Sequence, residues 1–164
     1  MTGTTQAPAT TQVFRVHIKA TPEAVWDAIT SPEWTERYGY RARSEYDLRP
    51  GGAFRSLANE GMLQAGAPEV VVEGEVLESD PPRRLVQTWR MLFGPELIAE
   101  PMTRVTWEIV DENGVARLTV THELEGAAAH SALVTGDVPE AGGGWPFILS
   151  DLKTLLETGT ALGG

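Results

Sequence analysis

Residues 145–158, WPFILSDLKTLLET, decide the fold. Apolar side chains recur in this segment three or four positions apart, the spacing that places them on one face of an α-helix. These apolar positions are Trp145, Ile148, Leu149, Leu152, Leu155 and Leu156. So wide an apolar face has to be buried, and the sequence therefore predicts a C-terminal helix that packs on a sheet.

The segments before this helix predict the sheet. Alternating or continuous apolar residues indicate strands at 13–19, 44–48, 53–57, 69–78, 84–92, 102–110 and 116–124. Turn-forming residues connect several of them: RPGG at 49–52, DPP at 80–82 and DENG at 111–114. Serial hairpins of this kind predict an antiparallel meander. The longer connections, 56–68 and 125–144, are rich in Gly and Ala and are expected to be loops, the second a flexible gate.

Two short helices are expected between the first and second strands. Thr21-Pro22-Glu23 and Ser31-Pro32-Glu33 each place a capping residue before a proline and a glutamate, which is a helix start signal. The prediction is thus an α+β fold. A curved antiparallel sheet of about six or seven strands wraps around one long C-terminal helix.

Composition limits the classes of partner. The chain has 164 residues, enough for one domain with a buried core. Its 23 acidic and 13 basic residues give a net charge of −10, which disfavours nucleic acid and anionic membrane surfaces. There are no cysteines and only three histidines, so we expect no metal and no cofactor. Residues 1–12 are expected to form a disordered tail, and the protein to be cytoplasmic, as a monomer or homodimer.

Aromatic residues gather where the sheet and the C-terminal helix are expected to meet. Trp89 and Trp107 lie on neighbouring predicted strands. Other aromatic residues fall near the predicted open end of the fold: Trp34, Tyr38, Tyr40 and Trp145. Large rigid rings suit a flat apolar ligand, so these residues are candidate ligand-binding residues. The alternative is that they only fill the core.

His122 is the candidate catalytic residue and also a candidate ligand-binding residue. It shares strand parity with Leu118 and Val120, so its imidazole is expected to point inward, where it could orient a ligand carbonyl or act as a general base. The alternative is a core histidine bonded to the backbone or to a hydroxyl. His17 is expected on the outward face of the first strand, and His130 in the mobile loop, both exposed to solvent. No nucleophile elbow, phosphate loop or metal-ligand spacing occurs.

Several short strings resemble a known superfamily. They are ATPEAVW at 20–26, DLRPGGAF at 47–54, DPPRRLV at 80–86, TRVTWE at 103–108, RLTVTHE at 117–123 and GW at 144–145. In order and character they resemble the bacterial members of the START-like, or SRPBCC, superfamily of helix-grip, polyketide-cyclase-like proteins. Within it they resemble the branch of the heat-shock-protein-90 ATPase activator homologues. The resemblance spans about residues 13–156.

The resemblance implies a START-like ligand-binding domain over residues 13–160, with a small hydrophobic or aromatic metabolite bound between sheet and helix. It leaves three alternatives open. One is a cyclase, dehydratase or hydrolase that acts on such a ligand, with His122 as acid or base and Tyr38 or Tyr40 assisting. Another is a natural-product self-resistance or sequestration protein. The last is a partner-binding module like the chaperone activators.

Overall fold

The structure, a computed structural model, describes residues 10–138 and 142–163. Within them, seven strands form one sheet: β1 (Thr11–Ile18), β2 (Arg43–Tyr46), β3 (Ala53–Leu57), β4 (Val70–Asp80), β5 (Arg84–Met91), β6 (Thr103–Glu112) and β7 (Val115–Glu123). The helices are α1 (Pro22–Thr30), α2 (Pro32–Thr35), α3 (Glu60–Gln64), α4 (Pro95–Ile98), α5 (Ala128–Val134) and α6 (Gly144–Thr158). The predicted α+β fold is confirmed.

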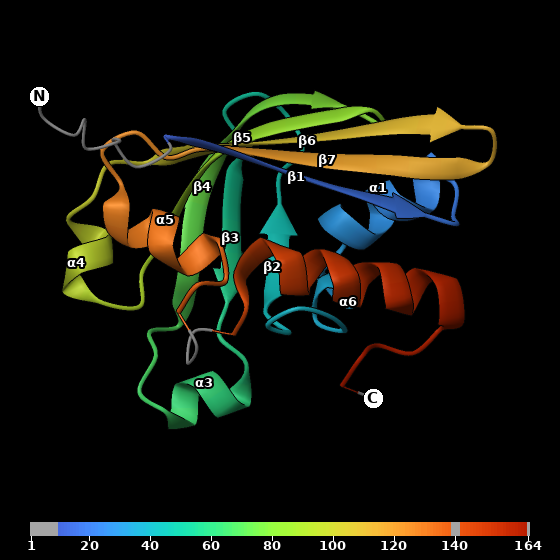
Figure 1. Ribbon diagram of the computed structural model, residues 1–164. Helices are drawn as coiled ribbons and strands as arrows, with labels where there is room; N and C mark the ends of the chain where they lie inside the picture. Colours follow the sequence, from blue (N-terminus) through green and yellow to red (C-terminus); the bar gives the residue numbers. More distant parts are fainter. Residues whose placement is uncertain (1–9, 139–141, 164) are drawn as a thin grey trace, which may run out of the picture.

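The sheet is antiparallel throughout, in the order β1-β7-β6-β5-β4-β3-β2. Strands β1 and β2 therefore lie at opposite edges, and the segment that contains α1 and α2 runs from one edge to the other. Thr21 starts α1 as predicted, because its side chain accepts a hydrogen bond from the Ala24 N–H at 3.1 Å. Figure 1 shows the sheet curving over α6, with β3 and β4 turned away from the direction of β1 and β7.

Helix α6 is the element that the sheet encloses. It packs on β1 and α1, and Leu149, Leu152 and Leu155 are buried along it. The helix ends at Gly159, whose φ of 85° is a left-handed conformation that glycine adopts without steric cost. The apolar spacing in the sequence thus identified both the helix and its buried face.

The curvature of the sheet has a local cause on β4. The register between β4 and β5 shifts between Val76 and Glu78, as expected of a β-bulge, and such a bulge bends the strand. Near this bulge the backbones approach so closely that a Cβ on Gly74 would lie 1.9 Å from the carbonyl oxygen of Thr88. Only glycine fits at this position.

Three expectations need correction. Strand β1 begins at Thr11, two residues before its predicted start, so residues 11 and 12 are not part of a tail; the disorder expected for residues 1–9 lies outside the described residues. The connections 56–68 and 125–144 are not simple loops, because they contain α3 and α5. Helix α3 is too short to show a clear apolar period, and its cap is local, since the Asn59 side chain accepts from the Met62 N–H. The cap of α5 comes from a residue distant in the sequence, Glu100.

Among the described residues, every helix falls short of the length and apolar character needed to cross a membrane.

Gly74→Ala should destabilise the protein by about 3 kcal/mol, because the added methyl group forces β4 and β5 apart at the bend. Gly61→Ala is the matched control, since a Cβ there lies 3.5 Å from its nearest neighbour and α3 favours alanine. Urea unfolding of the wild type and both variants measures the change in the free energy of unfolding. Equal stability of the two would show that the close approach at Gly74 does not exist.

Candidate functional site

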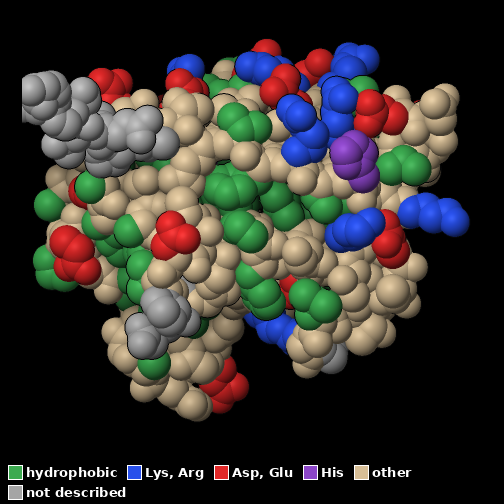
Figure 2. Space-filling model, in the orientation of Figure 1, with side chains coloured by type: hydrophobic (Ala, Val, Ile, Leu, Met, Phe, Trp, Pro, Cys, Tyr) green, Lys and Arg blue, Asp and Glu red, His purple; other side chains and the backbone are tan. Residues whose placement is uncertain are grey.

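A cavity of about 520 Å³ lies between the concave face of the sheet and the helices. Its wall takes residues from α1, α2, α3, α5 and α6, from strands β2 to β6, and from the segment 38–42, here called the mouth loop. Its volume falls within the range of roughly 300–1,000 Å³ typical of small-molecule sites. Figure 2 shows the surface hollowed between the lobe that carries α3 and the C-terminal end of the chain.

One row of residues across four strands forms much of the sheet side of the cavity. The strand register aligns Ser44, Ser56, Val72 and Met91 from β2 to β5, and all of them line the cavity. Adjacent positions point to the opposite face, where charges alternate along Glu45, Arg55, Glu73 and Arg90. The wall and the charged outer face are thus set by the two-residue period of the strands.

Tryptophan rings from β5, β6 and α6 continue the cavity wall beyond this row. The rings of Trp107 on β6 and Trp145 at the start of α6 meet edge to face, with centroids 5.2 Å apart. The ring centroid of Trp89 on β5 lies 6.1 Å from that of Trp145. Such contacts fix the planes of the rings, so the aromatic surface is already arranged before any ligand enters.

The structure brings together five of the seven residues predicted to bind ligand. The cavity wall contains Tyr38, Tyr40, Trp89, Trp107 and Trp145. Trp34 and His122 are not among the described residues of this wall. Trp34 instead packs against the core, with the guanidinium of Arg37 4.7 Å above its ring.

The two tyrosines of the mouth loop stay protonated near neutral pH. Burial, and then the nearby Asp151 carboxylate, raise the pKa of Tyr38, whose hydroxyl donates to the Ala28 carbonyl at 2.8 Å. Burial also raises the pKa of Tyr40, although the hydrogen bond from the Gly144 N–H partly opposes the shift. Neither phenol is therefore suited to act as a base.

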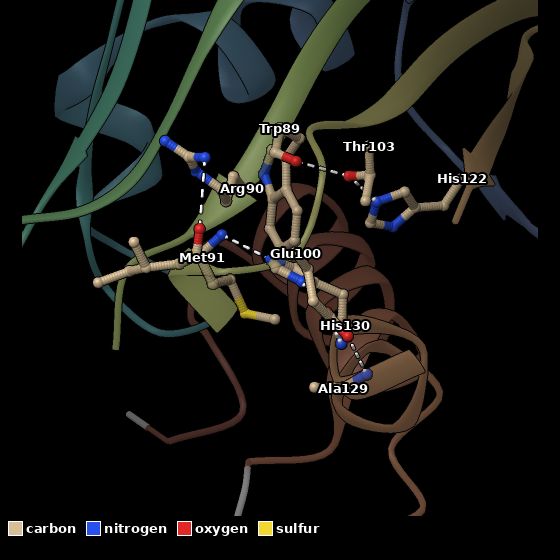
Figure 3. A network of polar contacts seen from close by, with 9 residues as sticks. Trp89, Arg90, Met91, Glu100, Thr103, His122, Ala129 and His130 are labelled. Atoms are coloured by element: carbon tan, nitrogen blue, oxygen red, sulfur yellow. Dashed lines mark hydrogen bonds and ion pairs between the residues drawn. The ribbon is translucent and has the colours of Figure 1, made fainter. Parts of the chain in front are cut away.

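His122 points inward as predicted, but both of its ring nitrogens are bound within the protein. Nδ1 accepts from Trp145 Nε1–H at 3.0 Å, so the ring proton lies on Nε2 and is donated to Thr103 Oγ1 at 2.8 Å. Thr103 in turn donates to the Trp89 carbonyl, as Figure 3 shows. Burial, and then the charge that His130 carries when protonated, lower the pKa of His122 from its usual 6.5 to about 3. This series of hydrogen bonds favours the interpretation of His122 as a core histidine that holds Trp145 and Trp89 in place.

The expectation for His130 is wrong. Its side chain is fully buried on α5, where Nε2 accepts from the Met91 N–H at 2.9 Å and Nδ1 lies 2.7 Å from Glu100 Oε1 (Figure 3). Burial alone would raise the pKa of Glu100, but hydrogen bonds from the Ala129 N–H, the His130 ring and the His130 N–H lower it. Glu100 thereby caps α5 and, through His130, ties it to β5.

A signal for the His130 site was present in the sequence. Ala127, His130 and Val134 are spaced by three and four residues, as on one face of a helix, and all are buried. Its partner Glu100 lies 30 positions away, and no local pattern could have linked them.

Asp151 is a second residue that the sequence analysis missed. It lies three residues after Ile148, on the apolar side of α6, and is buried. Its carboxylate accepts from the Gly39 N–H at 2.8 Å and from the Leu162 N–H at 2.7 Å. It therefore fixes the mouth loop and the C-terminal segment to the helix.

Within residues 10–138 and 142–163, no cluster of three or more His, Asp or Glu side chains is arranged to hold a metal ion.

The family of the protein follows from its sequence and agrees with this architecture. The sequence model of the family described as Activator of Hsp90 ATPase homolog 1-like protein matches residues 19–157, most of the chain. The chain belongs to this family. The resemblance to the heat-shock-protein-90 ATPase activator homologues noted in the sequence is thereby confirmed. No curated protein matches this chain.

Solved structures share the fold of this chain at low sequence identity. CalU16 from Micromonospora echinospora in solution has a TM-score of 0.64 at 24% identity, over 94% of this chain and 69% of that one. DynU16, a protein of the dynemicin biosynthetic locus, has a TM-score of 0.67 at 22% identity, over 94% of this chain and 49% of that one. PFC0360w, an HSP90 activator from Plasmodium falciparum, has a TM-score of 0.63 at 18% identity, over 90% of this chain and 96% of that one.

His122 should make stability depend on pH. The folded protein keeps the imidazole neutral down to a pKa of about 3, whereas the unfolded chain takes up a proton below about 6.5, so stability falls as pH falls through this window. Between pH 6.5 and about pH 5 the loss from this one group should be about 1.5 kcal/mol.

Urea unfolding of the wild type and of His122→Gln at both pH values measures this loss, which the variant should lack. His17→Gln is the control, because His17 lies on the exposed face of β1 as predicted. A His122→Gln variant with the pH slope of the wild type would contradict the neutral, buried imidazole.

Proposed function

We propose that the protein binds a small hydrophobic or aromatic molecule in the cavity. The observation that carries the proposal is the cavity itself, about 520 Å³ in volume, with three tryptophan rings and the row across β2 to β5 in its wall. The hydrogen bonds of His122 and His130 hold the wall from behind, so little ordering remains to be done when a ligand binds.

The groups that face the cavity favour binding over acid–base chemistry. Among the described residues of the wall, the titratable ones are Tyr38, Tyr40, Tyr46 and Arg41. The pKa of each tyrosine is raised, in Tyr46 by burial and then by nearby Tyr38, and an arginine keeps its charge. None of these groups exchanges a proton readily near neutral pH, whereas a general acid or base needs a pKa near the working pH.

A cyclase-like activity is the second candidate. It is favoured by the structural similarity to DynU16, a protein of a biosynthetic locus, and by a rigid cavity that could bring two parts of a flexible substrate together. Such catalysis by shape needs no proton-transferring residue in the wall.

Native mass spectrometry of the purified protein, beside a denatured sample, tests the binding proposal. A small molecule that is released on unfolding supports it, and the mass before and after incubation shows whether the molecule is converted. A protein that carries no such molecule and gains no thermal stability from a panel of aromatic compounds would contradict it.

Val72→Trp should weaken binding of an aromatic ligand by at least about tenfold, because the larger side chain occupies the middle of the cavity wall. Val13→Trp is the matched control, since it makes the same change on the exposed face of β1, where Val13 is 56% exposed. Titration by tryptophan fluorescence quenching, with circular dichroism to confirm folding, measures both. Equal affinities in the two folded variants would place the ligand elsewhere.

A further inference from the structure

Strands β2 and β3 and the mouth loop bring several polar side chains to the cavity wall. Ser44 and Ser56 lie opposite each other on β2 and β3, with their hydroxyl oxygens 2.7 Å apart. One hydroxyl donates to the other, so the second hydroxyl proton of this pair can be donated to a ligand. The mouth loop, which leads directly into β2, adds Arg41. The indole N–H groups of Trp107 and Trp145 are already used, because they donate to Gln87 and His122.

Arg41 is the one cation among the described residues of the wall, and no carboxylate of those residues lines the cavity. Its guanidinium makes no ion pair within the described part of the chain. Acidic side chains in the adjoining hollow have other partners: Glu36 is 3.2 Å from Arg43, and Glu60 accepts from Gln64. A positive charge therefore remains at the cavity mouth of a protein whose net charge is −10.

The backbone at Arg41 is strained and firmly held. Its φ of 58° is left-handed, an uncommon conformation for a residue other than glycine. The preceding residues fix the loop: Asp151 accepts from the Gly39 N–H, Asn59 Nδ2 donates to the Tyr40 carbonyl at 3.0 Å, and the Gly144 N–H donates to the Tyr40 hydroxyl. Strain that the surroundings impose in this way is typical of functional positions.

We propose that the ligand of this cavity is an aromatic acid whose ring system lies against the tryptophans and whose anionic group binds Arg41. This inference rests on the proposed function of the cavity. The Ser44–Ser56 pair donates a hydrogen bond to an oxygen on the same edge of the ligand. A carboxylate held by a guanidinium forms a charge-assisted hydrogen bond, which is stronger than a neutral one.

A pair of fluorescent probes tests the charge requirement. Anthracene-9-carboxylate is ionised at neutral pH, and anthracene-9-methanol has the same ring system without the charge. The wild type should bind the acid about tenfold more tightly than the alcohol. Raising the salt concentration should weaken binding of the acid and leave the alcohol unchanged.

Arg41→Gln should weaken binding of the acid about tenfold, so that the preference for the acid over the alcohol is lost. Arg41→Gly is the second variant, because glycine adopts the left-handed conformation without strain and keeps the test available if the glutamine variant does not fold. Arg55→Gln is the matched control, since Arg55 lies on the outer face of β3 and pairs with Glu45. The control should keep the wild-type preference.

Each contrary result has a distinct meaning. Equal binding of acid and alcohol by the wild type would overturn the aromatic-acid inference and leave the proposed binding function intact. A preference that persists in Arg41→Gln and Arg41→Gly would also overturn it, because another group would then bind the anion. Failure of the wild type to bind either probe would count against both the inference and the proposed function.

Discussion

The burial of one apolar helix face controls the architecture of this protein. Along α6, Leu149, Leu152 and Leu155 are buried in the core formed with the curved sheet. The first turn differs, because Trp145 and Ile148 face the cavity. The sheet grips the helix closely along these leucines and leaves space at its first turn, so the same amphipathic segment that stabilises the fold also forms part of the binding site.

Buried polar residues give this space its shape. His122 joins the first turn of α6 to the end of β5 through Thr103, and His130 joins α5 to β5. Both imidazoles have one nitrogen accepting and one donating, the pattern of a neutral ring. A neutral, fully bonded histidine inside a core fixes its neighbours in place without the desolvation cost of a buried charge. The aromatic wall is therefore rigid because of residues that do not themselves line it.

The sequence predicted those features that depend on local order. Strand β3 spans Ala53–Leu57 as expected, and α6 begins at Gly144, one residue before its predicted start. Both elements were predictable because apolar periodicity and capping depend on residues that are neighbours in the sequence. Five aromatic residues of the wall were also predicted, but Tyr46, Phe54 and Phe93, which line it as well, were not. Contacts between distant positions were not: Glu100 with His130, and Asp151 with Gly39, pair groups whose separation in the sequence gives no hint of their distance in space. The placement of His122 behind Trp145, beyond the wall, likewise depends on tertiary packing.

The alternation of cavity-facing and outward-facing residues along β2 to β5 affects how such a protein can change over evolution. Ser44, Ser56, Val72 and Met91 face the cavity, while the neighbouring position on each strand belongs to the charged outer row. Substitutions in the inner row can alter ligand preference while the outer pairs, the strand register and the grip on α6 persist. A lineage could therefore acquire new ligands by drift at few positions, and structures with about a fifth of their residues in common could retain one backbone.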